Sequence, residues 1–221
     1  LLEYAWSTND ETPTEQWVTF NNGDVLQTPD GLAGELYLFT RGKDILGNNI
    51  ERYYGALTVD SISPSPPKIE FPDGWVNHSV VISIADGLDE HSEIEKTEYR
   101  INGSDWLKYE SEIELKDEGV YTIEARTIDE PGNLSDVTIA EVKIDKTKPN
   151  LVIEKIENSN KLLITARDSL SGVKESTLPD GSIVELESTE LTIEKNGQYE
   201  IIVTDFAGNK TTELIEVNVS D

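Results

Sequence analysis

The sequence predicts an all-β protein made of tandem β-sandwiches, and three observations lead to this fold class. Short runs of alternating apolar and polar residues recur along the 221 residues, and no stretch has a helical period of useful length. A turn sequence with an Asp three residues before a Gly-Asn pair occurs three times. The hydrophobic content of 36% is low for a compact enzyme but sufficient for thin sandwiches that bury one face of each strand.

The turn sequence divides the chain into three repeats. Its copies are "KDILGNN" (43–49), "IDEPGNL" (128–134) and "TDFAGNK" (204–210). An alternating run precedes each copy, and a second run after each copy reaches an Asp 12 residues beyond the turn Asn, at Asp60, Asp145 and Asp221. We therefore predict repeats at 1–65, 66–147 and 148–221. The first repeat is expected to be N-terminally truncated, because it lacks equivalents of the first two strands and an unpaired sandwich edge would be sticky.

The third repeat shows the strand pattern in most detail. Asp-Gly and Asn-Gly pairs punctuate it, as expected for hairpin turns between short strands. The predicted strands are 151–156, 161–167, 173–178, 182–186, 191–195, 198–204 and 212–219. Within the repeated turn itself, the Asp carboxylate is expected to cap backbone N–H groups, and Gly to take a positive φ. Local structure alone accounts for the motif, so we interpret it as a turn and not as a catalytic site.

The stretch "DEGVY" (117–121) matches the D-x-G-x-Y pattern of the immunoglobulin tyrosine corner. With "EYRINGSDW" (98–106), "DSLSGV" (168–173), "IDKTKP" (144–149) and the three turns, the chain resembles bacterial Ig-like repeats of secreted and cell-wall surface proteins. The resemblance implies immunoglobulin-like β-sandwiches joined by short Pro-containing linkers, here 60–68 and 145–150. It also implies a stalk or spacer outside the cell, sometimes beside a ligand-binding or enzymatic domain.

The amino-acid composition limits the kinds of partner that the protein is expected to bind. The formal net charge of −26 repels phosphate backbones and anionic lipids, so nucleic acid is not expected as a partner. No apolar run has the length of a membrane span. The absence of cysteine excludes disulfides, thiol catalysis and Cys-ligated zinc. The expected partners are neighbouring domains of the same protein and, beyond these, a host protein or a polysaccharide.

Calcium binding is the only site chemistry that the sequence supports. The B–C and F–G loops of an immunoglobulin-like sandwich share one end, and calcium is bound by six to eight oxygen ligands. Two sets of residues are therefore candidate ligands: Asp168, Asp205 and Asn209 in the third repeat, and Asp86, Asp89 and Asp129 in the second. The alternative is that these acidic loops are simply solvated, or neutralised by nearby lysines.

No set of residues indicates catalysis, and we expect a non-enzymatic protein. The two histidines, His78 and His91, lack obvious partners for a zinc triad or a nucleophile-base pair. Trp17 and Trp106 occupy equivalent repeat positions, which favours a packing role over carbohydrate stacking. The expected function is a spacer segment of a bacterial extracellular surface protein of the adhesin type. The alternative is an accessory module that binds or positions polysaccharide for a secreted carbohydrate-active enzyme.

Overall fold

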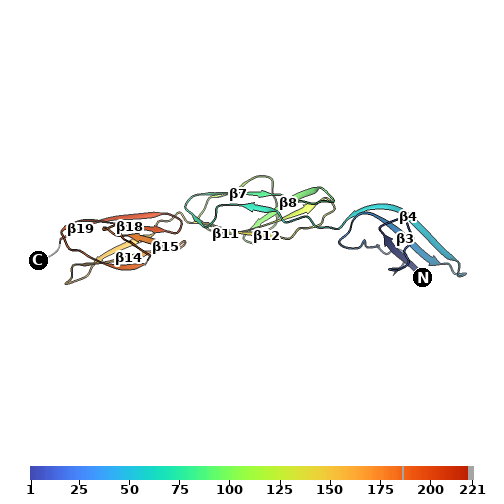
Figure 1. Ribbon diagram of the computed structural model, residues 1–221, viewed down its shortest axis with the longest axis horizontal. Coiled ribbons are helices and arrows are strands. Elements are labelled where there is room, and N and C mark those ends of the chain that lie inside the picture. Colours follow the sequence, from blue (N-terminus) through green and yellow to red (C-terminus); the bar gives the residue numbers. More distant parts are fainter. Residues whose placement is uncertain (186, 219–221) are drawn as a thin grey trace.

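The computed structural model describes residues 1–185 and 187–218, and every regular element in this part of the chain is a β-strand (Figure 1). The prediction of an all-β fold is therefore confirmed. The strands form three groups that follow one another along the long axis, with the two termini at opposite ends (Figure 1). Asp221, the last of the three aspartates that stand 12 residues after a turn Asn, lies outside the described residues. The described part of the chain contains no helix capable of crossing a lipid bilayer.

Repeat 1 is one antiparallel sheet. Its strand order is β2 (Val18–Phe20), β1 (Leu2–Ser7), β3 (Ala33–Lys43) and β4 (Asn49–Asp60). Ala5, Leu36 and Phe39 are its buried hydrophobic residues. No strand of a second sheet occurs in residues 1–65, all of which the structure describes. This group of strands is thus a single layer, in contrast to the two groups that follow.

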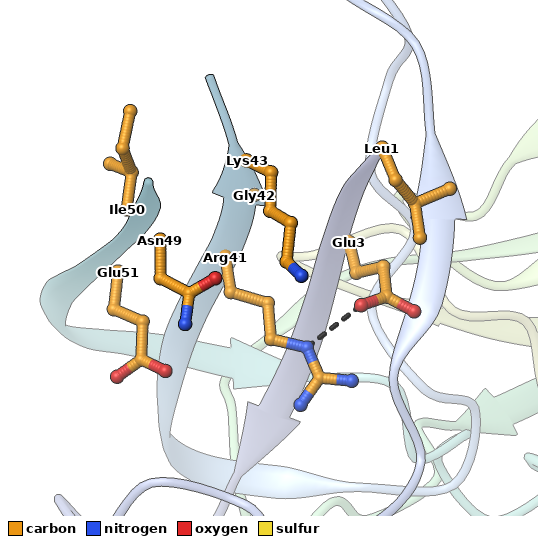
Figure 2. A pocket seen from close by; sticks show the side chains of 8 residues that line it. All are labelled: Leu1, Glu3, Arg41, Gly42, Lys43, Asn49, Ile50 and Glu51. Carbon is orange, nitrogen blue, oxygen red and sulfur yellow. Dashed lines mark hydrogen bonds and ion pairs between the residues drawn. The ribbon is translucent and has the colours of Figure 1, made fainter. Parts of the chain in front are cut away.

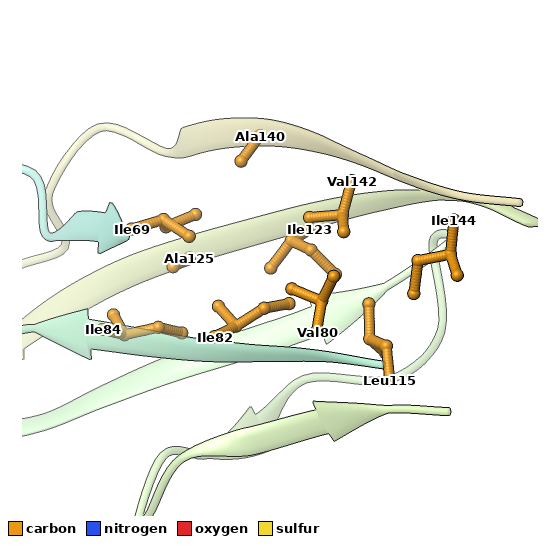
Figure 3. Packing of buried hydrophobic residues seen from close by; sticks show 10 residues of the cluster. All are labelled: Ile69, Val80, Ile82, Ile84, Leu115, Ile123, Ala125, Ala140, Val142 and Ile144. Carbon is orange, nitrogen blue, oxygen red and sulfur yellow. The ribbon is translucent and has the colours of Figure 1, made fainter. Parts of the chain in front are cut away.

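Repeat 2 is a two-layered β-sandwich. One sheet has the order β10 (Ile113–Leu115), β7 (Val80–Ala85) and β5 (Lys68–Glu70). The other has the order β6 (Trp75–Val76), β12 (Thr138–Ile144), β11 (Gly119–Asp129), β8 (Ile94–Ile101) and β9 (Leu107–Lys108). Ile82 of the first sheet and Ile123 and Ile144 of the second are fully buried between the layers (Figure 3). Alternation along each strand directs one set of side chains into this core.

Repeat 3 has the same architecture with fewer strands. One sheet has the order β13 (Asn150–Lys155), β14 (Lys161–Arg167) and β17 (Ser188–Thr192). The other has the order β16 (Ile183–Val184), β15 (Val173–Thr177), β18 (Gly197–Asp205) and β19 (Lys210–Val217). Leu162, Ile164 and Ile201 are almost completely buried. Each strand predicted from the sequence has a counterpart here, although β17 begins three residues earlier than predicted.

The tyrosine corner predicted at Tyr121 is present. The Tyr121 hydroxyl donates a hydrogen bond to the carbonyl oxygen of Asp117 at 3.0 Å. Tyr199 makes the equivalent bond to the carbonyl oxygen of Lys195 at 2.6 Å. In each repeat this bond fixes the start of the strand that leads to the repeated turn. The turn therefore lies at the opposite end of that strand from the tyrosine corner.

Candidate functional site: the joints between repeats

The repeated turns have the local geometry expected from the sequence. Gly47, Gly132 and Gly208 have φ angles of 87°, 98° and 91°, which a residue with a side chain adopts only with strain. The turn Asp accepts a hydrogen bond from the backbone N–H of the turn Asn in each copy: Asp44 from Asn48 at 2.9 Å, Asp129 from Asn133 at 2.6 Å, and Asp205 from Asn209 at 2.8 Å. The predicted capping role of the Asp is confirmed.

The Asn of the turn has a second role that the sequence did not predict. The side-chain amide of Asn133 donates to Asp129 Oδ2 at 2.7 Å and to the backbone carbonyl of Asp60 at 3.2 Å. The amide of Asn209 donates to Asp205 Oδ2 and to the backbone carbonyl of Asp145, both at 2.8 Å. Both amide hydrogens are thereby used, one within the turn and one at the end of the preceding repeat. The turn therefore holds two repeats together.

A second contact recurs at both joints. The hydroxyl of Thr138 donates to the carbonyl of Pro67 at 2.6 Å, and the hydroxyl of Thr211 donates to the carbonyl of Pro149 at 2.5 Å. Each Thr lies in, or at the start of, the last strand of its repeat, and each Pro lies at the end of the linker that enters that repeat. Each linker is thus attached to the following repeat through two backbone carbonyls, that of the Asp at its start and that of the Pro near its end.

The first linker also packs closely against the loop after β7. Ser65 N–H donates to the Leu88 carbonyl at 2.8 Å, and Leu88 N–H donates to Ser65 Oγ at 2.7 Å. A Cβ on Gly87 would lie 1.8 Å from the Ser65 carbonyl oxygen. Only glycine allows this approach of two backbones, so Gly87 is required for the joint.

At the second joint, three carboxylates converge. One oxygen from each of Asp145, Asp168 and Asp205 lies within 4.8 Å of the other two, and Asp145 and Asp205 are completely buried. Asp145 Oδ1 accepts a hydrogen bond from Thr147 N–H and its Oδ2 accepts one from Ser171 N–H, both at 3.0 Å. No ion pair in the described part of the chain involves any of the three. Burying like charges at this distance without a cation is unfavourable.

The first joint contains a related group, Asp60, Asp89 and His91. Asp60 Oδ1 accepts a hydrogen bond from Ile62 N–H at 2.9 Å, whereas Asp60 Oδ2 is buried and has no hydrogen-bond partner among the described residues. The backbone N–H groups of His91 and Ser92 hydrogen-bond to Asp89 and hold the pKa of that carboxyl below its ordinary value. Asp89 is therefore ionised at neutral pH, beside a buried oxygen without a partner.

The structure brings some of the ligand candidates predicted from the sequence together and leaves others apart. Asp168 and Asp205 lie together in the second joint, and Asp89 lies in the first. Asn209 is adjacent to Asp205 but contributes its amide as a donor. Asp86 and Asp129 join neither group: Asp86 accepts a hydrogen bond from Thr97 Oγ1 at 2.6 Å, and the Asp129 carboxylate holds its own turn.

Sequence reasoning missed Asp60, Asp145 and His91. The two aspartates carried a signal, because both stand 12 residues after a turn Asn. We interpreted that spacing only as evidence of repetition.

The remaining hollows and aromatic residues show no catalytic arrangement among the described residues. An open hollow beside β1, β3 and β4 is lined by charged and aliphatic side chains, with Arg41 Nε paired to Glu3 Oε2 at 2.8 Å (Figure 2). Trp17 lies under the Arg41 guanidinium, 4.1 Å from the ring centroid. Trp106 lies under two guanidinium groups, those of Arg100 and Arg126. These two tryptophans pack against charged side chains.

Comparison with known proteins gives similarity in fold only. No known sequence family matches the chain, and no curated protein does. Among solved structures, fibronectin(III)-like modules of CbhA from Clostridium thermocellum align with 14% identity and a TM-score of 0.38, over 67% of this chain and 92% of that one. The chicken CNTN1 FN1–FN3 domains align with 15% identity and a TM-score of 0.29, over 84% of this chain and 75% of that one. The assignment of the sandwich fold therefore rests on the strand order and pairing described above.

Proposed function

We propose that this chain is a non-enzymatic spacer segment of a bacterial extracellular surface protein, one that holds a functional domain at a distance from its anchor. The observation that supports this most directly is the equivalence of the two joints. Asn133 and Asn209 make the same two hydrogen bonds, and Thr138 and Thr211 make the same third one. Hydrogen bonds near both ends of each linker limit bending at the joints, and so favour an extended chain.

Charge supports the same proposal. With 44 acidic and 18 basic residues, neighbouring copies on a crowded surface repel one another. The accessory-module alternative depends on exposed, coplanar Trp6 and Trp75. Both are only half-exposed, they belong to different repeats, and the Trp6 indole N–H is bonded to the carbonyl of Gln27 at 2.7 Å. We therefore prefer the spacer.

We further propose that divalent cations, calcium in particular, reinforce the joints. At the second joint, calcium would neutralise Asp145, Asp168 and Asp205, which no side-chain cation in the described residues neutralises. At the first joint, calcium would supply the partner that the buried Asp60 Oδ2 lacks among the described residues. His91 stands there in place of a third carboxylate, and calcium prefers oxygen ligands. We therefore expect the second joint to bind calcium more tightly than the first.

Small-angle X-ray scattering on the whole chain tests the spacer proposal. The expected result is a single elongated particle whose maximum dimension is the same at low and high ionic strength, because the joints are held by short-range bonds. A distribution of compact and extended particles would instead mean free hinges, and it would contradict the proposal. Glycan arrays and pull-downs on matrix proteins are the matching tests for a ligand-binding module.

A further inference from the structure

The sheet of repeat 1 leaves the face that repeat 2 uses as its core uncovered along its edge strand β4. The two sheets can be superposed by register, counting back from the turn Asp. Leu38, six residues before Asp44, pairs with Trp6 on one side and Tyr54 on the other. Ile123, six residues before Asp129, pairs with Ile101 and Ala140. Leu38, Trp6 and Tyr54 therefore occupy core positions of the sandwich, and we call the face on which they lie the core-type face.

The exposure of equivalent residues differs sharply between the two repeats. Ala140 and Val142 of β12 are 6% and 1% exposed, beneath the second sheet of repeat 2. Their counterparts on β4, Tyr54 and Leu57, are 47% and 46% exposed. Every residue of β4 from Asn49 to Thr58 is exposed. Large apolar side chains at core positions are thus left in water, which is unfavourable in proportion to their area.

The core-type face has a hollow that is lined partly by apolar side chains. Its six apolar lining residues are Leu2, Phe20, Leu26, Leu38, Ile50 and Tyr54. The other face carries the ion pair between Arg41 and Glu3 (Figure 2), and on it Phe39 packs against Tyr53 with ring centroids 5.2 Å apart. The register with repeat 2, and not a difference in polarity between the faces, therefore identifies the core-type face.

Repeat 2 shows what covers such a face in this chain. Its core face is covered chiefly by β5 and β7, and β7 contributes the alternating residues Val80, Ile82 and Ile84 (Figure 3). We propose that the core-type face of repeat 1 is a strand-accepting surface for two antiparallel strands with this alternating aliphatic pattern, joined in cis to the start of β1. Topology selects this arrangement, because β7 leads by one short loop into β8, the equivalent of β1.

The turn of repeat 1 supports the proposal independently. Asn48 Nδ2 donates to Asp44 Oδ2 at 2.7 Å, as its counterparts do in the other turns. Asn133 and Asn209 donate their second amide hydrogen to the polypeptide that enters their repeats. The second amide hydrogen of Asn48 has no acceptor among the described residues. Repeat 1 therefore has both parts of an entry site: a donor for an incoming backbone and the core-type face for the strands that follow it.

A chimera tests the proposal. Tyr4 and Tyr99 occupy equivalent positions, so residues 66–95 copied ahead of Leu1 place a β5–β7 segment where the proposal requires it. The copied strands should raise the first melting transition by about 5 °C or more and reduce the fluorescence of the dye ANS. The control is the same chimera with Val80, Ile82 and Ile84 of the copy changed to Ser. Equal behaviour of chimera and control would overturn the proposal.

A pair of substitutions tests the proposal even if the copied segment fits poorly. Tyr54→Lys with Leu57→Lys should change the melting of the unmodified chain little, because both side chains are half in water. In the chimera the same pair should abolish the gain in stability, because the residues have become core. Should the unmodified chain instead be a dimer in light scattering that the Lys pair dissociates, a second copy occupies the face and the proposal is wrong.

Discussion

The side-chain amide of Asn209 donates a hydrogen bond to the backbone carbonyl of Asp145, 64 positions earlier in the chain and in the preceding repeat. The same amide donates to Asp205 beside it. A motif that looks local in sequence is therefore shared between two repeats, and this dual use can be tested by comparing a turn that makes the bond between repeats with one that does not.

Asn209→Asp should loosen the second joint while leaving the third sandwich folded. The new carboxylate cannot donate to the Asp145 carbonyl and lies against the Asp205 carboxylate, so about 1–3 kcal/mol of joint stability is lost. Scattering should show a broader distribution of particle lengths, and amide exchange should increase in residues 145–150. Asn48→Asp is the matched control, since Asn48 makes no bond between repeats in the described structure. Equal broadening in both variants would contradict the role given to Asn209.

Calcium should raise the melting temperature of the wild-type chain, and a chelator should reverse the rise. Asp168→Asn should abolish most of it, because the amide oxygen can still accept the Leu170 and Gly172 N–H bonds while the charge is removed. Asp180→Asn, in an exposed hairpin outside both acidic groups, should respond to calcium as wild type does. Calorimetric scans with calcium and with EDTA make the measurement. An unchanged melting temperature in wild type would remove the metal proposal.

Gly87→Ala should destabilise the first joint. The new Cβ would meet the Ser65 carbonyl oxygen at 1.8 Å, and both residues are held in place by their backbone N–H groups, Ser65 on the Leu88 carbonyl and Gly87 on Thr127 Oγ1. A cost of about 2–3 kcal/mol is expected in urea unfolding of repeat 2. Gly55→Ala is the control, because a Cβ there meets nothing within 4 Å and the φ angle is not positive. A loss for Gly87→Ala no larger than for Gly55→Ala would show that the linker adapts.

Asn48→Ala should raise the pKa of Asp44. The side-chain amide of Asn48, followed by its backbone N–H, holds the pKa of Asp44 below the ordinary value. Because the folded-state pKa is the lower one, the stabilisation is complete above the unfolded pKa of about 3.9 and is lost as the pH falls through the folded value. Carboxyl-detected NMR titration should show the Asp44 midpoint moving upward in the variant, while that of Asp180 stays in place. No movement would mean that the backbone bonds alone set the pKa.

Much of the fold followed from short-range patterns. The tyrosine corner at Tyr121 was predictable because its partner, Asp117, lies four residues away and the D-x-G-x-Y pattern is local. The positive φ of Gly132 was predictable for the same reason. The boundaries of β17 were less predictable from the sequence, because apolar and polar residues alternate only weakly over residues 188–195. Burial against β14 determines which of these residues pair.

The joints could be predicted only in part. Loop ends gave the position of Asp168 and Asp205, because a sandwich brings those loops together. The contribution of Asp145 depends on a neighbouring repeat reaching over the turn, and no periodicity within one repeat shows that. Likewise, the uncovered face of repeat 1 was implied by its small number of strands, but its side chains were identified only by the register of Leu38 with Tyr54.

The short strand β6 of repeat 2 runs parallel to β12, with Trp75 beside Lys143 and Val76 beside Ile144. The chain enters the repeat ahead of β6 and leaves it at the end of β12. Tension applied between the two ends therefore drags these parallel strands past each other, so their hydrogen bonds must break together rather than one after another. A strand of only two residues is thus expected to resist stretching of repeat 2.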